Sequence, residues 1–189
     1  GTTAKFNKPN DVAVDSLGNV YVADKENHLI RKIDSGGNVT TLAGQAGVSG
    51  STNGQGTTAK FNSPYGVAVD SSGNVYVSDK GNHLIRKINY SGNVTTLAGL
   101  DGVSGSSDGN GTNARFNSPY GVAVDSLGNV YVTDKDNHLI RKIDASGNVS
   151  TLAGQAGVQG SADGPGTSAR FQLPQKIALD SSGSIYVAD

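Results

Sequence analysis

The most constraining feature of this sequence is a repeat, because nearly the same wording returns every 55 residues. Three whole units are followed by the first 24 residues of a fourth. A fixed period of this length indicates one array of dependent units that share a core with their neighbours, rather than separate domains. We therefore treat the chain as a single array with the units 1–55, 56–110, 111–165 and 166–189.

Each unit alternates short apolar runs with turn residues. In the second unit we expect strands at the residue ranges 66–70, 74–78, 83–88 and 93–98, separated by turns rich in Gly, Ser, Asn and Asp. Val, Ile and Tyr, which favour strands, supply most of the apolar positions. No stretch keeps a helical period over enough length to compete. The pattern predicts an antiparallel β-meander in every unit.

The first two predicted strands are apolar on both faces. The runs Val67-Ala68-Val69 and Val75-Tyr76-Val77 contain no polar break, whereas a sheet with one solvated face would alternate. Both faces must therefore be covered, and the simplest cover is the next copy of the same sheet. The predicted fold class is all-β: a β-propeller of four-stranded antiparallel blades, with about 3.5 blades in this chain.

The long connection between units ends in a regular Ala-x-Phe pattern. We expect Ala59 and Phe61, with their equivalents, to be buried between blades, because a loop of this length needs an apolar anchor. The alternative is that the four phenylalanines form a binding surface. These are Phe6, Phe61, Phe116 and Phe171.

Composition excludes several classes of function. Fifteen basic and 16 acidic residues give a net charge of −1, without the basic face that nucleic acid requires. Cysteine is absent, so disulfides and thiolate metal sites are excluded. No apolar run approaches the ~20 residues of a membrane span. We expect neither nucleic acid nor a membrane as partner. The absence of methionine and of a leader leads us to expect a processed chain or a piece of a longer one.

The stretch Pro64 to Ile88, P-Y-G-V-A-V-D-S-S-G-N-V-Y-V-S-D-K-G-N-H-L-I-R-K-I, and its copies resemble the NHL repeat. The trailing G-N-V-T-T-L-A-G is similar to the long-period form of bacterial proteins and teneurins. The resemblance implies a β-propeller, most often six-bladed, and favours an extracellular bacterial source. RNA-binding members have a basic surface, and the net charge of −1 argues against that role.

The polar residues that recur in every unit are interpreted as structural. Asp and Asn bond to the backbone of tight turns, and we expect each arginine to reach a turn Asp of a neighbouring blade. The alternatives are a His–Asp metal site or a basic ring for phosphate. We expect no metal and no cofactor, because equivalent residues of a propeller lie on a circle and do not converge. The residues given this turn or inter-blade role are Asp24, Asn27, His28, Arg31, Asp79, Asn82, His83, Arg86, Asp134, Asn137, His138 and Arg141.

The positions that differ between units lie just before the first predicted strand. By strand polarity, the loop entering this strand and the turn after the second strand emerge on the same face, at the mouth of the central channel. Ligand sites favour such hollows, so this is the candidate binding site. Its residues are Asn10, Tyr65, Tyr120 and Gln175. The alternative is that they only fill the funnel.

Ring closure is the remaining question, since three and a half blades cannot form a ring of four to eight. We expect a homodimer with six complete blades, in which the hairpin of residues 174–189 docks on the outer strands of the partner's first unit and displaces that unit's own inner pair. The leading interpretation is a non-enzymatic scaffold or binding module that self-associates, with a protein or glycan ligand. The alternatives are a metal-dependent lactonase or lyase and a carbohydrate-binding propeller.

Overall fold

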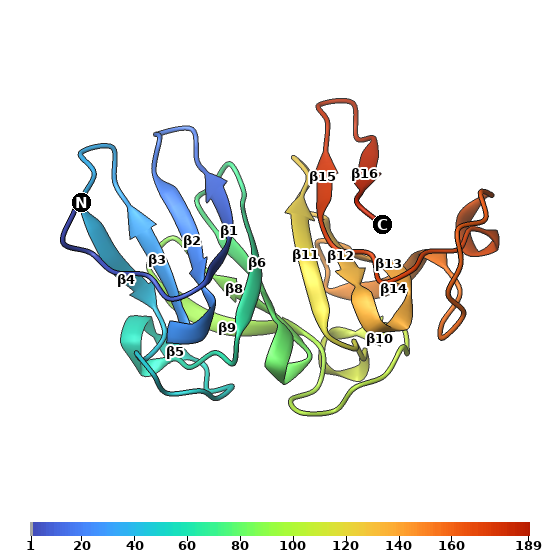
Figure 1. Ribbon diagram of the computed structural model, residues 1–189, viewed down its shortest axis with the longest axis horizontal. Coiled ribbons are helices and arrows are strands. Elements are labelled where there is room, and N and C mark those ends of the chain that lie inside the picture. Colours follow the sequence, from blue (N-terminus) through green and yellow to red (C-terminus); the bar gives the residue numbers. More distant parts are fainter. Residues whose placement is uncertain (1) are drawn as a thin grey trace.

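The computed structural model describes residues 2–189 and consists of antiparallel sheets arranged in an open arc (Figure 1). Three four-stranded meanders and one hairpin give about 3.5 blades, and the ring is not closed. The fold class predicted from the repeat is confirmed. The first blade contains β1 (Pro9–Val14), β2 (Val20–Asp24), β3 (Leu29–Ile33) and β4 (Val39–Ala43).

The following blades repeat this order. The second contains β6 (Pro64–Val69), β7 (Val75–Asp79), β8 (Leu84–Ile88) and β9 (Asn93–Ala98). The third contains β11 (Pro119–Val124), β12 (Val130–Asp134), β13 (Leu139–Ile143) and β14 (Asn148–Gly154). The fourth unit supplies only the hairpin β15 (Ile177–Leu179) and β16 (Ile185–Val187).

Two features of the blades are absent from the sequence-based description. The long connections contribute the two-residue strands β5 (Gly54–Gln55) and β10 (Gly109–Asn110), which pair with β9 and β14. The turn after the second strand of each full blade is a short 3-10 helix. These helices are η1 (Lys25–Asn27), η3 (Lys80–Asn82) and η5 (Lys135–Asn137). Three further 3-10 turns lie in the connections, at η2 (Gly56–Thr58), η4 (Gly111–Asn113) and η6 (Gly166–Ser168).

The core lies between blades and not within one sheet. Tyr21 and Ile30 of the first blade pack against Val67 and Val75 of the second, and the connection inserts Phe61 into the same cluster. The same arrangement joins the second blade to the third and the third to the hairpin. Ala59 and Phe61 have 0% exposure, which confirms that the connection is anchored by buried apolar residues.

The two ends of the array expose the surfaces that are buried everywhere else. Val12 on β1 is 59% exposed, whereas the equivalent Val67 is 3% exposed in the second blade. Tyr186 on β16 is 59% exposed, whereas the equivalent Tyr76 is 4% exposed. Among residues 2–189, each end therefore presents a blade face with no further blade packed on it. No helix in residues 2–189 is long and apolar enough to cross a membrane.

Candidate functional site

The recurrent Asp and Arg form buried ion pairs within the second and third blades. Asp79 accepts hydrogen bonds from Asn62 N–H at 2.7 Å, from Asn82 Nδ2 at 2.8 Å and from Arg86 Nη1 at 2.9 Å. Arg86 also donates to the Lys60 carbonyl at 3.1 Å. Burial raises the pKa of Asp79 to about 6, and the charge of Arg86 opposes that rise. The pair ties the blade to the connection that precedes it.

The expectation that each arginine reaches a turn Asp of a neighbouring unit is met by Arg141, whose Nη2 lies 2.7 Å from Asp108 Oδ1 in the connection that ends the second unit. The ion pairs that Arg86 and Arg141 form with Asp79 and Asp134 of their own blades, at 2.9 and 2.8 Å, were not predicted. These pairs result from hairpin register, since Arg86 lies opposite Val77 in the β7–β8 ladder, two residues before Asp79. Both side chains then point to the same face, one pleat apart. The corresponding Arg31–Asp24 contact in the first blade is longer, at 3.4 Å.

The histidines provide the contact between blades. His28 Nδ1 accepts a hydrogen bond from Ser63 N–H at 3.1 Å, and His83 Nδ1 accepts one from Ser118 N–H at 3.0 Å. His138 makes the same bond to Leu173 N–H at 3.2 Å. Each imidazole thus holds the residue before the proline that begins the next blade. Within residues 2–189, no three His, Cys, Asp or Glu side chains gather to hold a metal.

The four residues of the predicted channel mouth lie in two kinds of environment. Tyr65 and Tyr120 are in contact, with ring centroids 3.8 Å apart and a 2.6 Å hydrogen bond between their hydroxyls. Asn10 Nδ2 donates to the Tyr65 carbonyl at 3.0 Å. The Gln175 carbonyl accepts from Thr133 Oγ1 at 2.6 Å, and the residue is exposed. Burial, together with the bond to Tyr65, raises the pKa of the Tyr120 hydroxyl.

The residue after these four positions is glycine in the second and third units and a charged residue in the first and fourth. A Cβ on Gly66 would lie 2.4 Å from the Tyr120 carbonyl oxygen and 2.8 Å from Ser78 Oγ. Ser78 Oγ fills this space, accepting from Gly66 N–H at 2.7 Å and donating to the Tyr120 carbonyl. Gly121 has the same close approach, to the Gln175 carbonyl oxygen at 2.5 Å. The two middle units therefore require glycine beside a hydroxyl residue.

In the first and fourth units, a charged residue and an alanine stand in place of the glycine and the hydroxyl residue. Asp11 stands where the middle units have glycine, and Ala23 stands where Ser78 lies in the second unit. Asp11 Oδ2 accepts a hydrogen bond from Val67 N–H at 3.1 Å. The first blade therefore bonds to the next blade through this carboxylate, whereas the second blade does so through the Ser78 hydroxyl. In the fourth unit the same two positions are Lys176 and Ala188.

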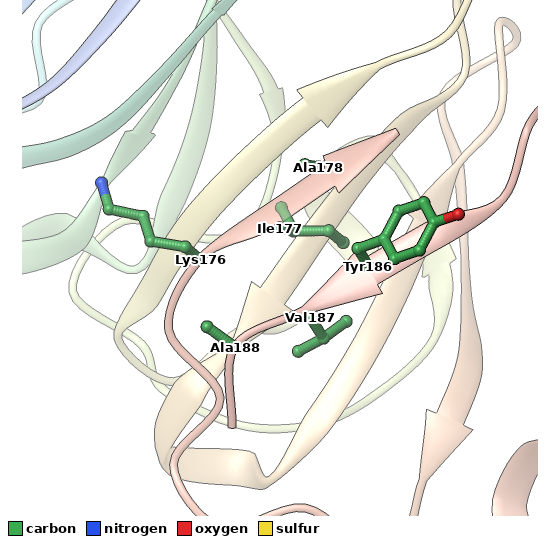
Figure 2. Close-up of a pocket in the computed structure, with 6 residues that line it drawn as sticks. All are labelled: Lys176, Ile177, Ala178, Tyr186, Val187 and Ala188. Carbon is green, nitrogen blue, oxygen red and sulfur yellow. The ribbon is translucent and has the colours of Figure 1, made fainter. Parts of the chain in front are cut away.

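Asp11 and Lys176 meet although 164 residues separate them in the sequence. Lys176 Nζ lies 2.8 Å from Asp11 Oδ1 and 3.3 Å from the Asn10 carbonyl oxygen. Figure 2 shows the lysine extending away from the hairpin β15–β16, on the side opposite Tyr186. The ion pair links the first and last units at the channel mouth.

Three lysines that sequence reasoning missed gather around the tyrosine pair. Lys80 Nζ lies 5.0 Å from the Tyr65 ring centroid and 5.6 Å from that of Tyr120. Lys25 lies 5.4 Å from the Tyr65 centroid, and Lys135 lies 4.5 Å from the Tyr120 centroid. Each is the first residue of a 3-10 turn, on the face where strand polarity placed the candidate site. The signal available in the sequence was a lysine recurring with the repeat beside the variable tyrosines.

Comparison with known proteins identifies the class to which these blades belong. The NHL repeat matches residues 6–33, 61–88 and 116–143, which span the inner three strands of each complete blade. The chain is an NHL-repeat protein of the β-propeller type, as its sequence motifs predict.

Relatives and solved structures agree with this assignment. Protein SUPPRESSOR OF QUENCHING 1, chloroplastic, of Arabidopsis thaliana is 33% identical over 75% of this chain and 14% of that protein. Teneurin-3 of Mus musculus is 24% identical over 98% of this chain and 8% of that protein. A crystal structure of a protein of unknown function from Bacteroides thetaiotaomicron aligns with a TM-score of 0.80 and 30% identity, over 97% of this chain and 45% of that one.

Streptogramin B lyase shares the fold alone, with 16% identity, a TM-score of 0.68 and coverage of 98% of this chain and 49% of that one. The chain thus spans about half the length of these solved structures and a smaller part of the curated relatives.

Proposed function

We propose that this protein is a non-enzymatic NHL propeller that acts as a scaffold and binding module, and that two copies complete one ring. The observation that carries the proposal is the pair of uncovered end faces. Val12 and Val14 are each 59% exposed at one end, and Tyr186 is 59% exposed at the other. Between the complete blades, the face that carries the valine equivalent to Val12 packs on the face that carries the tyrosine equivalent to Tyr186.

Exchange of hairpins is the mode of closure that we favour. Residues 185–189 read I-Y-V-A-D, which nearly repeats V-Y-V-A-D at 20–24, while the middle units carry V-Y-V-S-D and V-Y-V-T-D. β16 can therefore replace β2 beside β3 of a partner and restore the ladder that β2 makes in its own blade. Displacing β1–β2 replaces the β2–β3 ladder by an equivalent β16–β3 ladder, and six complete blades result. Ile177 and Leu179 of the partner's hairpin, which already pack on that partner's third blade, then take the places of Val12 and Val14, so the end face is covered.

The buried ion pair supports the same exchange. Asp189 occupies the position of Asp79 and accepts Gln172 N–H at 2.7 Å, as Asp79 accepts Asn62 N–H. Within residues 2–189, no third strand lies beside β16 to supply an arginine. In a partner's first blade, Arg31 would take that place, where its contact with Asp24 is now 3.4 Å.

The candidate catalytic groups have structural partners instead of open sites. The buried Asp carboxylates bond to arginine, the histidines bond to the backbone of the next blade, and Asp70 accepts Ser72 and Asn74 N–H in a turn at 2.9 Å each. An enzyme of this fold needs unlike residues free to meet one substrate. This supports a binding and scaffolding role.

Solution mass tests the proposal. Analytical ultracentrifugation of the wild type at tens of micromolar should give the mass of two chains. Tyr186→Asp should shift the mass to one chain, because it introduces a charge on the uncovered face of the hairpin (Figure 2). Tyr90→Asp is the matched control, since Tyr90 is 82% exposed in a turn of the second blade. A wild type of one-chain mass with cooperative unfolding would refute ring closure by a second copy.

A further inference from the structure

We propose that the hollow at the channel mouth binds a small oxyanion, a carboxylate or phosphate group, between Lys25 and Lys80, which line it beside the Tyr65–Tyr120 pair. The hollow has a volume of about 400 Å³. It lies between the turns η1 and η3 and the residues that precede β6 and β11. Its lining residues are Lys25, Glu26, Ser63, Lys80, Gly81, His83 and Ser118. This inference deepens the binding role proposed above and does not depend on ring closure.

The first argument is the crowding of positive charge. Lys25, Lys80 and Lys135 come from three successive blades and all lie within 6 Å of one aromatic pair. The rings attract the ammonium groups, whereas the like charges repel one another. An anion placed between Lys25 and Lys80 reduces that repulsion.

The second argument is the distribution of carboxylates around these lysines. Glu26 pairs with Lys25 at 3.1 Å, and Asp11 pairs with Lys176 at 2.8 Å. Asp136 follows Lys135 and is exposed, and it forms no ion pair within residues 2–189. In the second unit the residue after the lysine is Gly81, which carries no charge. Within the described chain, Lys80 and Lys135 therefore lack a carboxylate within ion-pair distance.

The third argument is the supply of neutral donors in the same hollow. His83 Nδ1 accepts Ser118 N–H, so in the neutral imidazole the proton resides on Nε2, which is then a donor. Burial lowers the pKa of His83, which favours this neutral form at pH 7. Ser63 and Ser118 add hydroxyls from backbone held at φ 52° and 54° by the histidine contacts. Ammonium, imidazole and hydroxyl donors suit the oxygens of one compact anion.

The arrangement favours a small ligand over a polyanion. Only two lysines line the hollow within the described residues, together with Glu26, and the chain carries a net charge of −1. A nucleic acid needs a basic surface extended along its backbone. Lysine also offers a point charge without the planar fork of arginine, so the site should accept carboxylate and phosphate with similar affinity.

Titration with inorganic phosphate and with citrate tests the inference. We expect wild-type protein to bind either anion saturably in isothermal calorimetry, with amide shifts in NMR spectra centred on residues 80–83 and 118–120. The double variant Lys25→Gln/Lys80→Gln should bind roughly tenfold or more weakly, because both lysines line the hollow. Lys87→Gln is the matched control, because Lys87 also lies over a tyrosine, 5.5 Å from the Tyr76 centroid, but outside the hollow.

Four results would overturn the inference: no saturable binding by the wild type, equal weakening in Lys87→Gln, amide shifts elsewhere, or binding of an RNA oligonucleotide without the small anions. Ultracentrifugation of the same samples separates this outcome from that of the proposed function. A one-chain mass with specific anion binding would refute ring closure alone, and a two-chain mass without anion binding would refute the anion site alone. Unchanged thermal unfolding of the double variant shows that its fold is intact.

Discussion

Lys176 in the fourth unit forms an ion pair with Asp11 in the first, with 2.8 Å between Nζ and Oδ1. The two residues occupy the same position of the repeat, where the middle units carry Gly66 and Gly121. The first and fourth units therefore carry opposite charges at a position that is glycine in the two units between them, and these charges are in contact. The ion pair joins the first and fourth units across the open arc, and we refer to it as the brace.

This brace should contribute little to the free energy of unfolding. The Lys176 side chain is 43% exposed and that of Asp11 is 21% exposed, so solvent screens the attraction. A double-mutant cycle of Asp11→Asn and Lys176→Gln in urea should give a coupling free energy of about 0.2–1 kcal/mol. The coupling should fall in 1 M salt. A coupling above about 2 kcal/mol would show that the pair is far less screened than its exposure indicates.

Removal of a phenylalanine should cost stability according to its place in the array. Phe61 is fully buried between two blades, whereas Phe6 lies at the uncovered end and is only half-buried. Phe61→Ala should lower the free energy of unfolding by about 3–5 kcal/mol, and Phe6→Ala by clearly less. Urea unfolding followed by circular dichroism measures both. Equal losses of unfolding free energy in the two variants would mean that Phe6 is as fully covered as Phe61. A closed ring would produce this result if Phe6 lies where the two chains meet.

The sequence predicted the blades well because repetition supplies the same evidence three times. The strand at 66–70 was predicted and β6 runs from Pro64 to Val69. The two-residue strand β5 was missed because Gly54–Gln55 has no apolar alternation. The partner of Arg86 was missed because we argued from neighbouring blades and not from hairpin register, which places Asp79 one pleat away.

The candidate site was predictable only in part. Strand polarity placed the variable residues Tyr65 and Tyr120 on the same face as the turns, and the structure brings the two rings into contact. Their approach to Lys25, Lys80 and Lys135 depends on the rotation from blade to blade, which no spacing in the sequence specifies. Without that rotation, the sequence predicts only that a lysine in a tight turn is exposed to solvent.

Gly66 should be intolerant of even one added carbon. A Cβ there would lie 2.4 Å from the Tyr120 carbonyl oxygen, so Gly66→Ala must separate the second and third blades. We expect a loss of about 2–4 kcal/mol in the free energy of unfolding. Gly73→Ala is the control, because Gly73 has a positive φ of 79° but open space around it, and about 1 kcal/mol is expected there.

The first unit suggests how that loss can be recovered. It carries Asn10, Asp11 and Ala23 where the second carries Tyr65, Gly66 and Ser78, and its polar groups still bond to the next blade. The triple variant Tyr65→Asn/Gly66→Asp/Ser78→Ala should therefore be more stable than Gly66→Ala, although its new side chains are larger. If the triple variant is the less stable of the two, the residues do not act as a coupled set.

The turn carboxylates should make stability depend on pH in the acid range. Asp70 accepts Ser72 N–H and Asn74 N–H at 2.9 Å, Asn74 Nδ2 at 2.8 Å and Tyr76 hydroxyl at 3.1 Å. Burial acts to raise the pKa of Asp70, but these hydrogen bonds outweigh it and hold the pKa below 3.8. A carboxyl whose pKa is lower in the folded state contributes stability above the unfolded pKa and loses it as pH falls through the folded value.

Asp70→Asn isolates this contribution. At pH 7 the wild type should exceed the variant by about 1 kcal/mol in the free energy of unfolding, since a partly exposed carboxylate is screened by solvent. The difference should persist down to about pH 4 and then shrink toward pH 2 as the wild-type carboxyl is protonated in both states. Urea titrations at each pH, with Asp163→Asn in an exposed connection as control, measure it. A difference that grows as the pH falls below 4 would contradict the lowered pKa of Asp70.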